Sequence, residues 1–199
     1  MPNTENLVSL QADETLWERV FTVAPLVLVG TREPDGRADL APKHLAFPMW
    51  GPWYGFVCSP THATYRNAVS GGAFTVSFPK PGHVVLTSLA ASPRYEDGEK
   101  HALEALETLP AREVDGVLVA DCSFHLECRL DRTVDGFGAN SLVIGRVVAA
   151  HADPDALRTL DREDDELIHT HPLLAYLYPK RFASIDQSLA FPFPAGFKR

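Results

Sequence analysis

The chain has 199 residues, of which 45% are hydrophobic, with a formal net charge of -8 and a sequence pI of about 5.4. A chain of this length and apolar content can bury one core, and we interpret residues 1–199 as a single domain. The acidic balance argues against nucleic acids and anionic membranes as partners, because both carry negative charge.

The compartment is indicated by the cysteines and by the start of the chain. Cys58, Cys122 and Cys128 are odd in number and form no C-x-x-C pair, which argues against a disulfide framework and a structural zinc site. Met1–Ala12 is polar and acidic, unlike a signal peptide, and no apolar run is long enough to span a bilayer. We therefore expect a cytoplasmic protein.

Hydrophobic periodicity and turn residues predict short elements along the whole chain. In the first half they are a helix at Asp13–Thr22, strands at Leu26–Thr31, Arg37–Phe47 and Gly51–Ser59, a helix at Ala63–Ser70 and a strand at Phe74–Phe78. In the second half they are helices at Val84–Ala91 and Ala102–Thr108, strands at Val117–Asp131 and Ser141–Ala150, and a helix at Asp155–Glu166.

The sequence also predicts a turn, an irregular C-terminal segment and a strand with one buried face. A turn is expected at Val134–Gly138, and irregular structure is expected over the proline-containing last thirty residues. From Phe124 the apolar residues alternate with His125, Glu127, Arg129 and Asp131, so one face of this strand should be buried and the other wet. Strands dominate and do not alternate regularly with helices, which favours an antiparallel barrel over a doubly wound parallel sheet.

A candidate phosphate site lies within Cys58–Asn67, where a strand is predicted to end and a helix to begin. Ser59 before Pro60 suits a helix N-cap, and a helix N-terminus attracts phosphate through unpaired N–H groups and a partial positive charge. An ordinary capped helix is the alternative, and composition alone favours it. Hydroxyl and basic side chains nearby would add donors: Thr61, His62, Thr64 and Arg66.

Other candidates are weaker when taken alone. Lys43 and His44 give a small basic spot in an acidic chain, or a solvated loop. Aromatic residues between positions 47 and 56 could line a pocket for a flat heterocycle, or pack in the core or a dimer surface. His169 and His171 lack the spacing of a metal motif, so we interpret them as exposed at a helix end and predict no metal site.

Several familiar catalytic motifs are absent from the sequence. It contains no G-x-G-x-x-G after a strand, no Walker loop and no G-x-S-x-G nucleophile elbow. Any dinucleotide would therefore bind in another mode. No side chain is assigned as a nucleophile or a general acid or base.

From about Pro25 to about Phe182, the chain resembles the flavin reductase-like, FMN-binding split-barrel family, which includes the flavoredoxins. It departs from the family pattern at Asp39 and His44, and at Asn140, which stands where many members have histidine. Four stretches carry the resemblance. Asp39–His44 resembles the family's Asn-x-Ala-Pro-x-Ser loop, and His62–Asn67 resembles its Thr-x-x-Asn segment, which a strand follows. Phe124–Cys128 resembles the central barrel strand, and Gly138–Val147 resembles the Gly-Asp-His…Gly-x-Val stretch.

The resemblance implies a mainly β fold, an antiparallel Greek-key split β-barrel with short flanking helices, working as a homodimer with FMN near the subunit interface. It also implies that the Ala41–His44 loop and the Ser59–Asn67 turn both contact the flavin. The cofactor-binding residues that we expect are Ala41, Pro42, Lys43, His44, Cys58, Ser59, Thr61, His62, Ala63, Thr64 and Asn67.

The activity that the resemblance implies is hydride transfer from NADH or NADPH to flavin N5, followed by electron transfer to a small molecule or a protein. The flavin would carry the chemistry, while Lys43 or His44 could stabilise its anionic reduced form. Because Asn140 replaces the usual histidine, a flavoredoxin-like electron carrier or FMN-binding module without its own NAD(P)H activity is the alternative. A barrel that has lost its cofactor is a third hypothesis.

Overall fold

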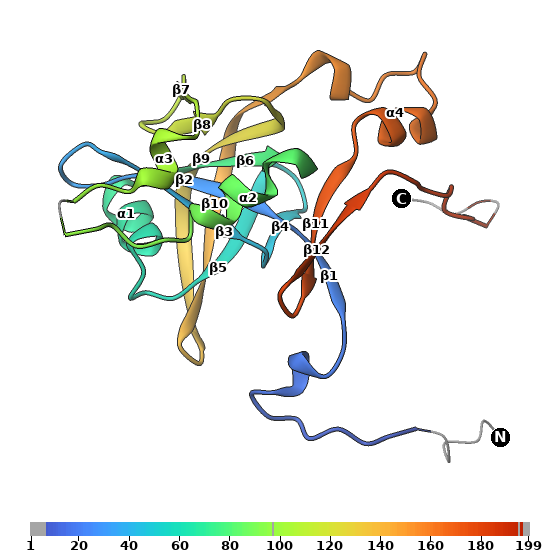
Figure 1. The fold of residues 1–199 in the computed structure, drawn as a ribbon, viewed down its shortest axis with the longest axis horizontal. Helices are drawn as coiled ribbons and strands as arrows, with labels where there is room; N and C mark the ends of the chain where they lie inside the picture. The colour runs from blue at the N-terminus through green and yellow to red at the C-terminus, as the bar shows by residue number, and fades with distance from the viewer. Residues whose placement is uncertain (1–6, 97, 195, 197–199) are drawn as a thin grey trace.

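The computed structural model describes residues 7–96, 98–194 and 196, and most of its regular structure is β (Figure 1). The strands are β1 (Thr22–Pro25), β2 (Val27–Arg32), β3 (Ala38–Lys43), β4 (Ala46–Met49), β5 (Trp53–Cys58), β6 (Ala73–Pro79), β7 (Thr108–Pro110), β8 (Val117–Val119), β9 (Cys122–Phe137), β10 (Asn140–Ala152), β11 (Leu173–Tyr178) and β12 (Arg181–Ile185). The helices are α1 (Ala63–Gly71), α2 (Val84–Leu89), α3 (His101–Glu104) and α4 (Asp164–Thr170), with 3-10 turns η1 (Leu16–Glu18), η2 (Pro81–His83) and η3 (Pro154–Ala156).

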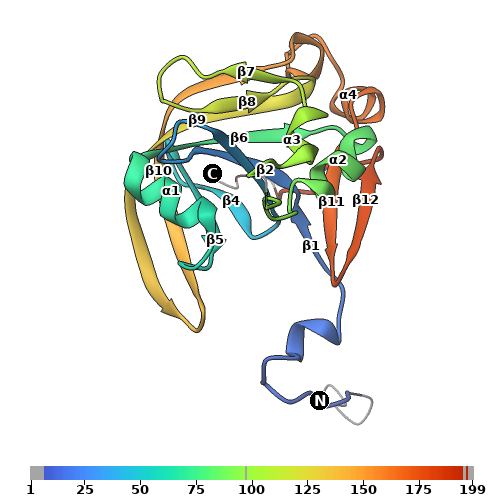
Figure 2. The same ribbon diagram turned by 60° about the vertical axis from the view of Figure 1, so that its left-hand side comes forward.

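The body of the molecule is one seven-stranded sheet in the order β3-β2-β6-β9-β10-β5-β4, with every neighbouring pair antiparallel. The sheet curls into an open half-barrel with β3 and β4 at its two edges (Figure 2). Helix α1 connects β5 to β6, which are not neighbours, and packs against β2, β3 and β6. The predicted mainly β, antiparallel split-barrel fold with short flanking helices is therefore confirmed.

The interior of the barrel is filled by aliphatic and aromatic side chains from β2, β5, β6, β9 and β10. The rings of Phe56 and Phe74 meet edge to face at 5.1 Å and 83°. Gly145 passes so close to the Phe74 ring that a Cβ on it would lie 2.5 Å from Cε1 of Phe74, which explains why this position lacks a side chain. The other fully buried members include Val27, Val29, Val76, Cys128 and Val143.

A second apolar cluster lies on the outer face of the sheet, where Leu28 and Leu40 pack with side chains from α2, α3 and the β7–β8 ribbon. This cover overturns the prediction of a wet second face for His125 and Glu127 on β9, whereas Arg129 and Asp131 on the same face are exposed as predicted. His125 is 8% exposed and Glu127 is fully buried, because loops joined to β7 and β8 lie over them.

The predicted helix at Asp13–Thr22 is wrong, since only the turn η1 forms and β1 begins at Thr22. Figures 1 and 2 show this arm leading away from the body. Most of its apolar face stays exposed in the described part of the chain, with Trp17 58% and Phe21 68% exposed. An isolated helix of this length is marginal in water without packing of that face.

The predicted irregular C-terminal segment is also wrong in part, because β11 and β12 form a hairpin. Together with β1 this hairpin makes a three-stranded sheet in the order β1-β11-β12. Pro172 precedes the first of these strands and Pro179 lies in the turn, so neither removes a donor from a strand interior.

Several element boundaries also differ from the prediction. The strand predicted at Arg37–Phe47 is divided into β3 and β4, and the one at Val117–Asp131 is divided at a turn where Asp121 has φ of 51°. Strand β9 continues through the predicted turn to Phe137, since the chain reverses only at Gly138, whose φ is 63°. The acidic helix begins at Asp164 rather than Asp155. No helix in the described part of the chain has the length and apolar character that a bilayer crossing requires.

Candidate functional site

The two stretches singled out in the sequence meet at one pocket with a volume of about 520 Å³. Four parts of the chain form it: Glu33 between β2 and β3, strand β3, the turn that leads into α1 with the first residues of that helix, and Ala90–Arg94 together with Lys100. The lining residues are Glu33, Asp39, Ala41, Lys43, Thr61, His62, Ala63, Thr64, Ala90, Ala91, Ser92, Pro93, Arg94 and Lys100.

The turn that leads into α1 differs from the prediction in its cap. Ser59 Oγ lies 2.9 Å from Thr61 Oγ1 and accepts the Thr61 N–H at 3.3 Å, so it stabilises the turn and not the helix. The N-cap is His62, whose side chain makes no capping hydrogen bond. The first N–H groups of an α-helix have no acceptor within the helix. At α1 they are therefore available where Ala63 and Thr64 line the pocket.

Positive charge exceeds negative charge among the side chains that line this pocket. Lys43, Arg94 and Lys100 are cationic, whereas Glu33 and Asp39 are the two carboxylates, which leaves one positive charge in excess. Lys43 has no ion-pair partner within the described part of the chain, in contrast to the other two. In a protein of net charge -8, such a pocket favours an anionic ligand.

Arg94 and Lys100 are each anchored by a carboxylate and by backbone. Arg94 donates from Nε to Glu33 Oε1 at 2.8 Å and from Nη2 to the Ala38 carbonyl at 2.9 Å. Lys100 donates from Nζ to Asp39 Oδ1 and to the Leu40 carbonyl, both at 2.8 Å. These bonds hold the segment after α2 against β3 and close one side of the pocket.

Six of the eleven predicted cofactor-binding residues line this pocket: Ala41, Lys43, Thr61, His62, Ala63 and Thr64. Pro42, His44, Cys58, Ser59 and Asn67 do not.

Three of these five have other contacts that account for their positions. The His44 ring stacks on Tyr176 with centroids 4.4 Å apart, and burial, then the charge of Lys43, lower its pKa below 6.5. Asn67 is buried and donates from Nδ2 to Thr31 Oγ1 at 3.3 Å, so it ties α1 to β2. The Cys58 thiol is buried in the barrel interior.

The sequence reasoning missed Arg94 and Lys100, which are distant in sequence from both candidate stretches. No local motif marks them, because only the fold brings the segment after α2 against β3. One signal was present: Asp39 lies between apolar residues of a strand, and a buried carboxylate requires a partner.

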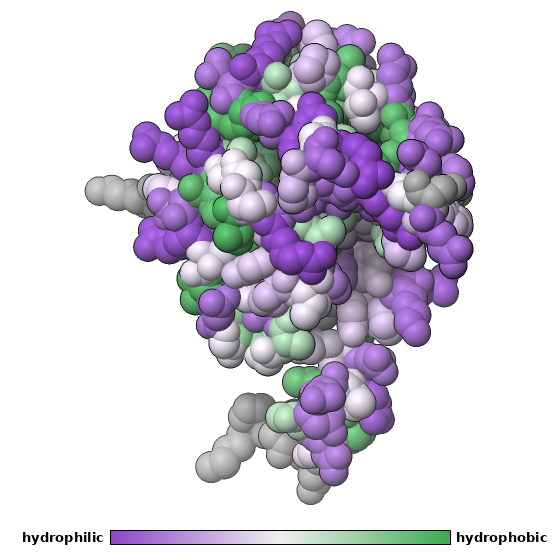
Figure 3. Space-filling view, turned by 90° about the vertical axis from the view of Figure 1, so that its left-hand side faces the viewer, coloured by the Kyte–Doolittle hydropathy of each residue, from purple (hydrophilic) through white to green (hydrophobic). Residues whose placement is uncertain are grey.

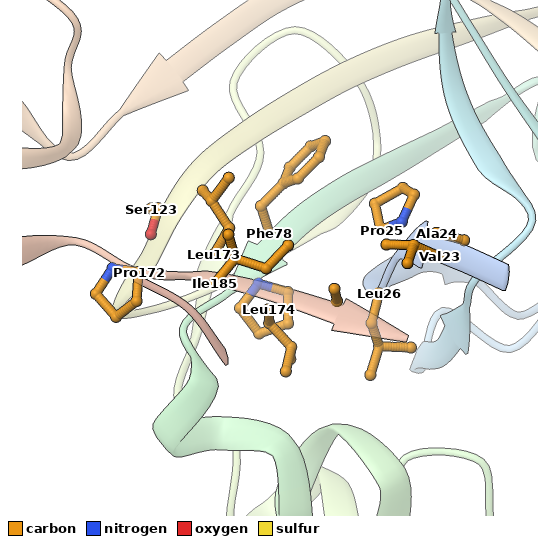
Figure 4. A pocket seen from close by; sticks show the side chains of 12 residues that line it. Val23, Ala24, Pro25, Leu26, Phe78, Ser123, Pro172, Leu173, Leu174 and Ile185 are labelled. Carbon is orange, nitrogen blue, oxygen red and sulfur yellow. The ribbon is translucent and has the colours of Figure 1, made fainter. Parts of the chain in front are cut away.

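Two other cavities differ in chemistry from this pocket. One, of about 390 Å³, lies between β1, β11 and the end of β6, and its lining is apolar except for the Ser123 hydroxyl (Figure 4). It contains no ionisable side chain. The other, of about 540 Å³, is lined by His125 and His151, with His125 Nδ1 3.2 Å from Ser77 Oγ. Within the described residues, no cluster of three or more metal-ligating side chains is placed to hold an ion.

The face that carries α1 is mainly hydrophilic, and its hydrophobic residues form small separate patches (Figure 3). An open antiparallel half-barrel with a positively charged pocket at a helix N-terminus places this chain among the split-barrel proteins. The family model for a flavin reductase-like domain matches residues 21–184, and the chain belongs to that family.

Solved structures agree on the fold. Flavoredoxin of Desulfovibrio vulgaris (Miyazaki F) is 23% identical, with a TM-score of 0.74 over 99% of this chain and 100% of that one. Nitrilotriacetate monooxygenase component B from Bacillus cereus is 18% identical, with a TM-score of 0.79 over 94% and 100%. A Shewanella frigidimarina NCIMB 400 protein with a split barrel domain is 16% identical, with a TM-score of 0.75 over 86% and 87%.

Proposed function

We propose that the protein binds FMN in the pocket between β3 and the start of α1 and transfers hydride from NADH or NADPH to the flavin. One observation carries the proposal. Two stretches about twenty residues apart, both expected to contact flavin, line a single pocket that has an excess of positive charge.

The residues present fit the phosphate end of FMN, which is a dianion. The N-terminus of α1, which lacks a side-chain cap, supplies N–H groups and a partial positive charge. The Thr61 and Thr64 hydroxyls can donate further hydrogen bonds, and Arg94 adds positive charge at the same pocket. This donor set matches the needs of a phosphate.

The residues present also fit the flat ring. A pocket of about 520 Å³ is within the usual range for cofactor sites, and Ala41 and Lys43 supply backbone and charge on β3. When bound, the flavin supplies the redox chemistry by accepting hydride at N5. The chain would contribute binding and orientation, and the Lys43 ammonium would stabilise negative charge on the ring. No acid–base side chain is required.

The first test is FMN binding by the purified chain, followed by rapid mixing of the loaded protein with NADH and with NADPH. Fast loss of the flavin's visible absorbance supports the reductase. Colourless protein that does not bind added FMN would contradict the proposal as a whole.

An electron carrier without NAD(P)H activity is the second candidate, and Asn140 favours it. This residue, where many family members have histidine, lies at the tip of the β9–β10 hairpin, outside the pocket. A carrier would bind FMN, show no reduction by either nicotinamide nucleotide over minutes, and be reduced by dithionite or a partner protein.

We further propose that the protein is a cytoplasmic homodimer. Large apolar side chains that are exposed in the described part of the chain support a dimer, among them Trp50, which is 94% exposed, and Phe137, which is 57% exposed. The three cysteines are unpaired and buried, which is usual in a reducing compartment. A monomeric mass by sedimentation at micromolar concentration would contradict the dimer.

A further inference from the structure

A buried ion pair joins Asp39, on the β3 wall of the pocket, to Lys100, the residue that precedes α3. Lys100 and Asp39 lie 61 positions apart, and their side chains are 6% and 7% exposed. Both residues line the pocket. Lysine is almost never buried to this degree unless it is paired.

The ammonium group of Lys100 is only partly used by its own chain. It carries three N–H donors, of which one goes to Asp39 Oδ1 and one to the Leu40 carbonyl. These are the two acceptors that the structure gives for the group among the residues it describes. One donor therefore remains for a ligand in the pocket.

The Asp39 carboxylate offsets the charge of Lys100 beside the same ligand. A buried pair is screened less by salt than an exposed pair, and each of its charges acts strongly on neighbouring groups.

We infer that the Lys100–Asp39 pair sets the charge that a flavin meets at the β3 wall and thereby the relative affinity of the pocket for reduced and oxidised flavin. This inference rests on the proposed function. Uptake of two electrons and one proton makes a flavin more negative by one unit. The positive charge of Lys100 therefore favours binding of the reduced flavin, and the negative charge of Asp39 disfavours it. Because the two charges cancel, the pair changes the relative affinity for the two forms little.

The test is the midpoint potential of bound FMN in Asp39→Asn, Lys100→Met and the double variant, each checked for folding by circular dichroism. We expect Asp39→Asn to raise, and Lys100→Met to lower, the ratio of reduced to oxidised affinity about tenfold. That change equals about 30 mV for a two-electron couple. The double variant, which has no charge at either position, should lie close to the wild type.

A matched control is Lys80→Met, which breaks an ion pair with Asp121 that lies outside the pocket. It should leave the potential unchanged. Shifts of the same sign in both single variants, or no shift in Asp39→Asn, would overturn the inference, because a purely structural pair has no reason to produce opposite signs. If Lys100→Met fails to fold, a rise of the potential in Asp39→Asn that the double variant reverses still supports the inference, and a rise that persists in the double variant overturns it. Failure of the wild-type chain to bind FMN would instead contradict the proposed function.

Discussion

His151 on β10 donates a hydrogen bond from Nε2 to the fully buried carboxylate of Glu127 on β9, at 2.7 Å. The same carboxylate accepts the backbone N–H groups of Arg112, Glu113 and Val114, at 3.0, 2.6 and 3.2 Å. Burial acts to raise the pKa of Glu127, but these hydrogen bonds outweigh it and lower the pKa below 4.5. One carboxylate thus fastens the loop between β7 and β8 to the barrel.

Glu127→Gln should destabilise the protein by about 2–4 kcal/mol, because an amide keeps the size but turns a donor toward N–H groups that need an acceptor. Urea unfolding followed by circular dichroism measures the loss. Glu113→Gln is the matched control, since this exposed side chain lies in the same loop and should change stability by less than about 0.5 kcal/mol. Equal stability of the two variants would show that the Glu127 carboxylate does not fasten the loop.

The protein should become less stable in mild acid, because His44 then takes up a proton. Burial and the Lys43 charge lower its pKa below 6.5, so the unfolded chain binds this proton more readily than the folded one. Its contribution to stability is therefore present above the unfolded pKa and is lost as the pH falls through the folded pKa. His44→Phe keeps a ring against Tyr176 but cannot titrate. Its free energy of unfolding, measured between about pH 7 and pH 5, should fall less than that of the wild type.

Gly145→Ala should cost about 1–3 kcal/mol through overpacking, since the added methyl would lie 2.5 Å from the Phe74 ring and 3.0 Å from Cβ of Cys128. Gly82→Ala is the comparison, because a Cβ there meets nothing within 4 Å and its φ is not positive. Thermal unfolding of both variants should show a clear drop only for Gly145→Ala. Similar melting temperatures would mean that the barrel interior relaxes around the methyl group.

The barrel could be predicted from the sequence where periodicity reflects burial. The alternation from Phe124 and the apolar run of β10 identified the central strands because both pack on one continuous interior. The same alternation wrongly predicted that Glu127 is exposed. A two-residue period indicates which side chains face the barrel interior, but it cannot show that a loop distant in sequence covers the other face of the strand. The helix expected around Trp17 does not form for the opposite reason, because its apolar stripe is largely exposed in the described part of the chain.

The candidate site was only half visible in the sequence. Thr61, Thr64 and Lys43 lie next to recognisable turn and strand signals, so local chemistry indicated them. His44 follows Lys43 directly, yet its ring packs on Tyr176 and does not line the pocket. The two neighbours differ because β3 ends at Lys43, and the sequence did not show where this strand ends. Arg94 and Lys100 depend wholly on long-range packing, because their partners Glu33 and Asp39 are each 61 positions away.

The contrast between Lys43 and His44 gives the most direct test of the proposed flavin site. Lys43 lines the pocket without an ion-pair partner among the described residues, whereas His44 does not line it. Lys43→Met should weaken FMN binding by about tenfold, the usual scale for one charge-assisted hydrogen bond, and should lower the midpoint potential of the bound flavin. His44→Phe should change neither quantity. Fluorescence titration with FMN and a redox titration of the loaded protein measure both effects, and equal behaviour of the two variants would mean that the ring does not lie beside β3.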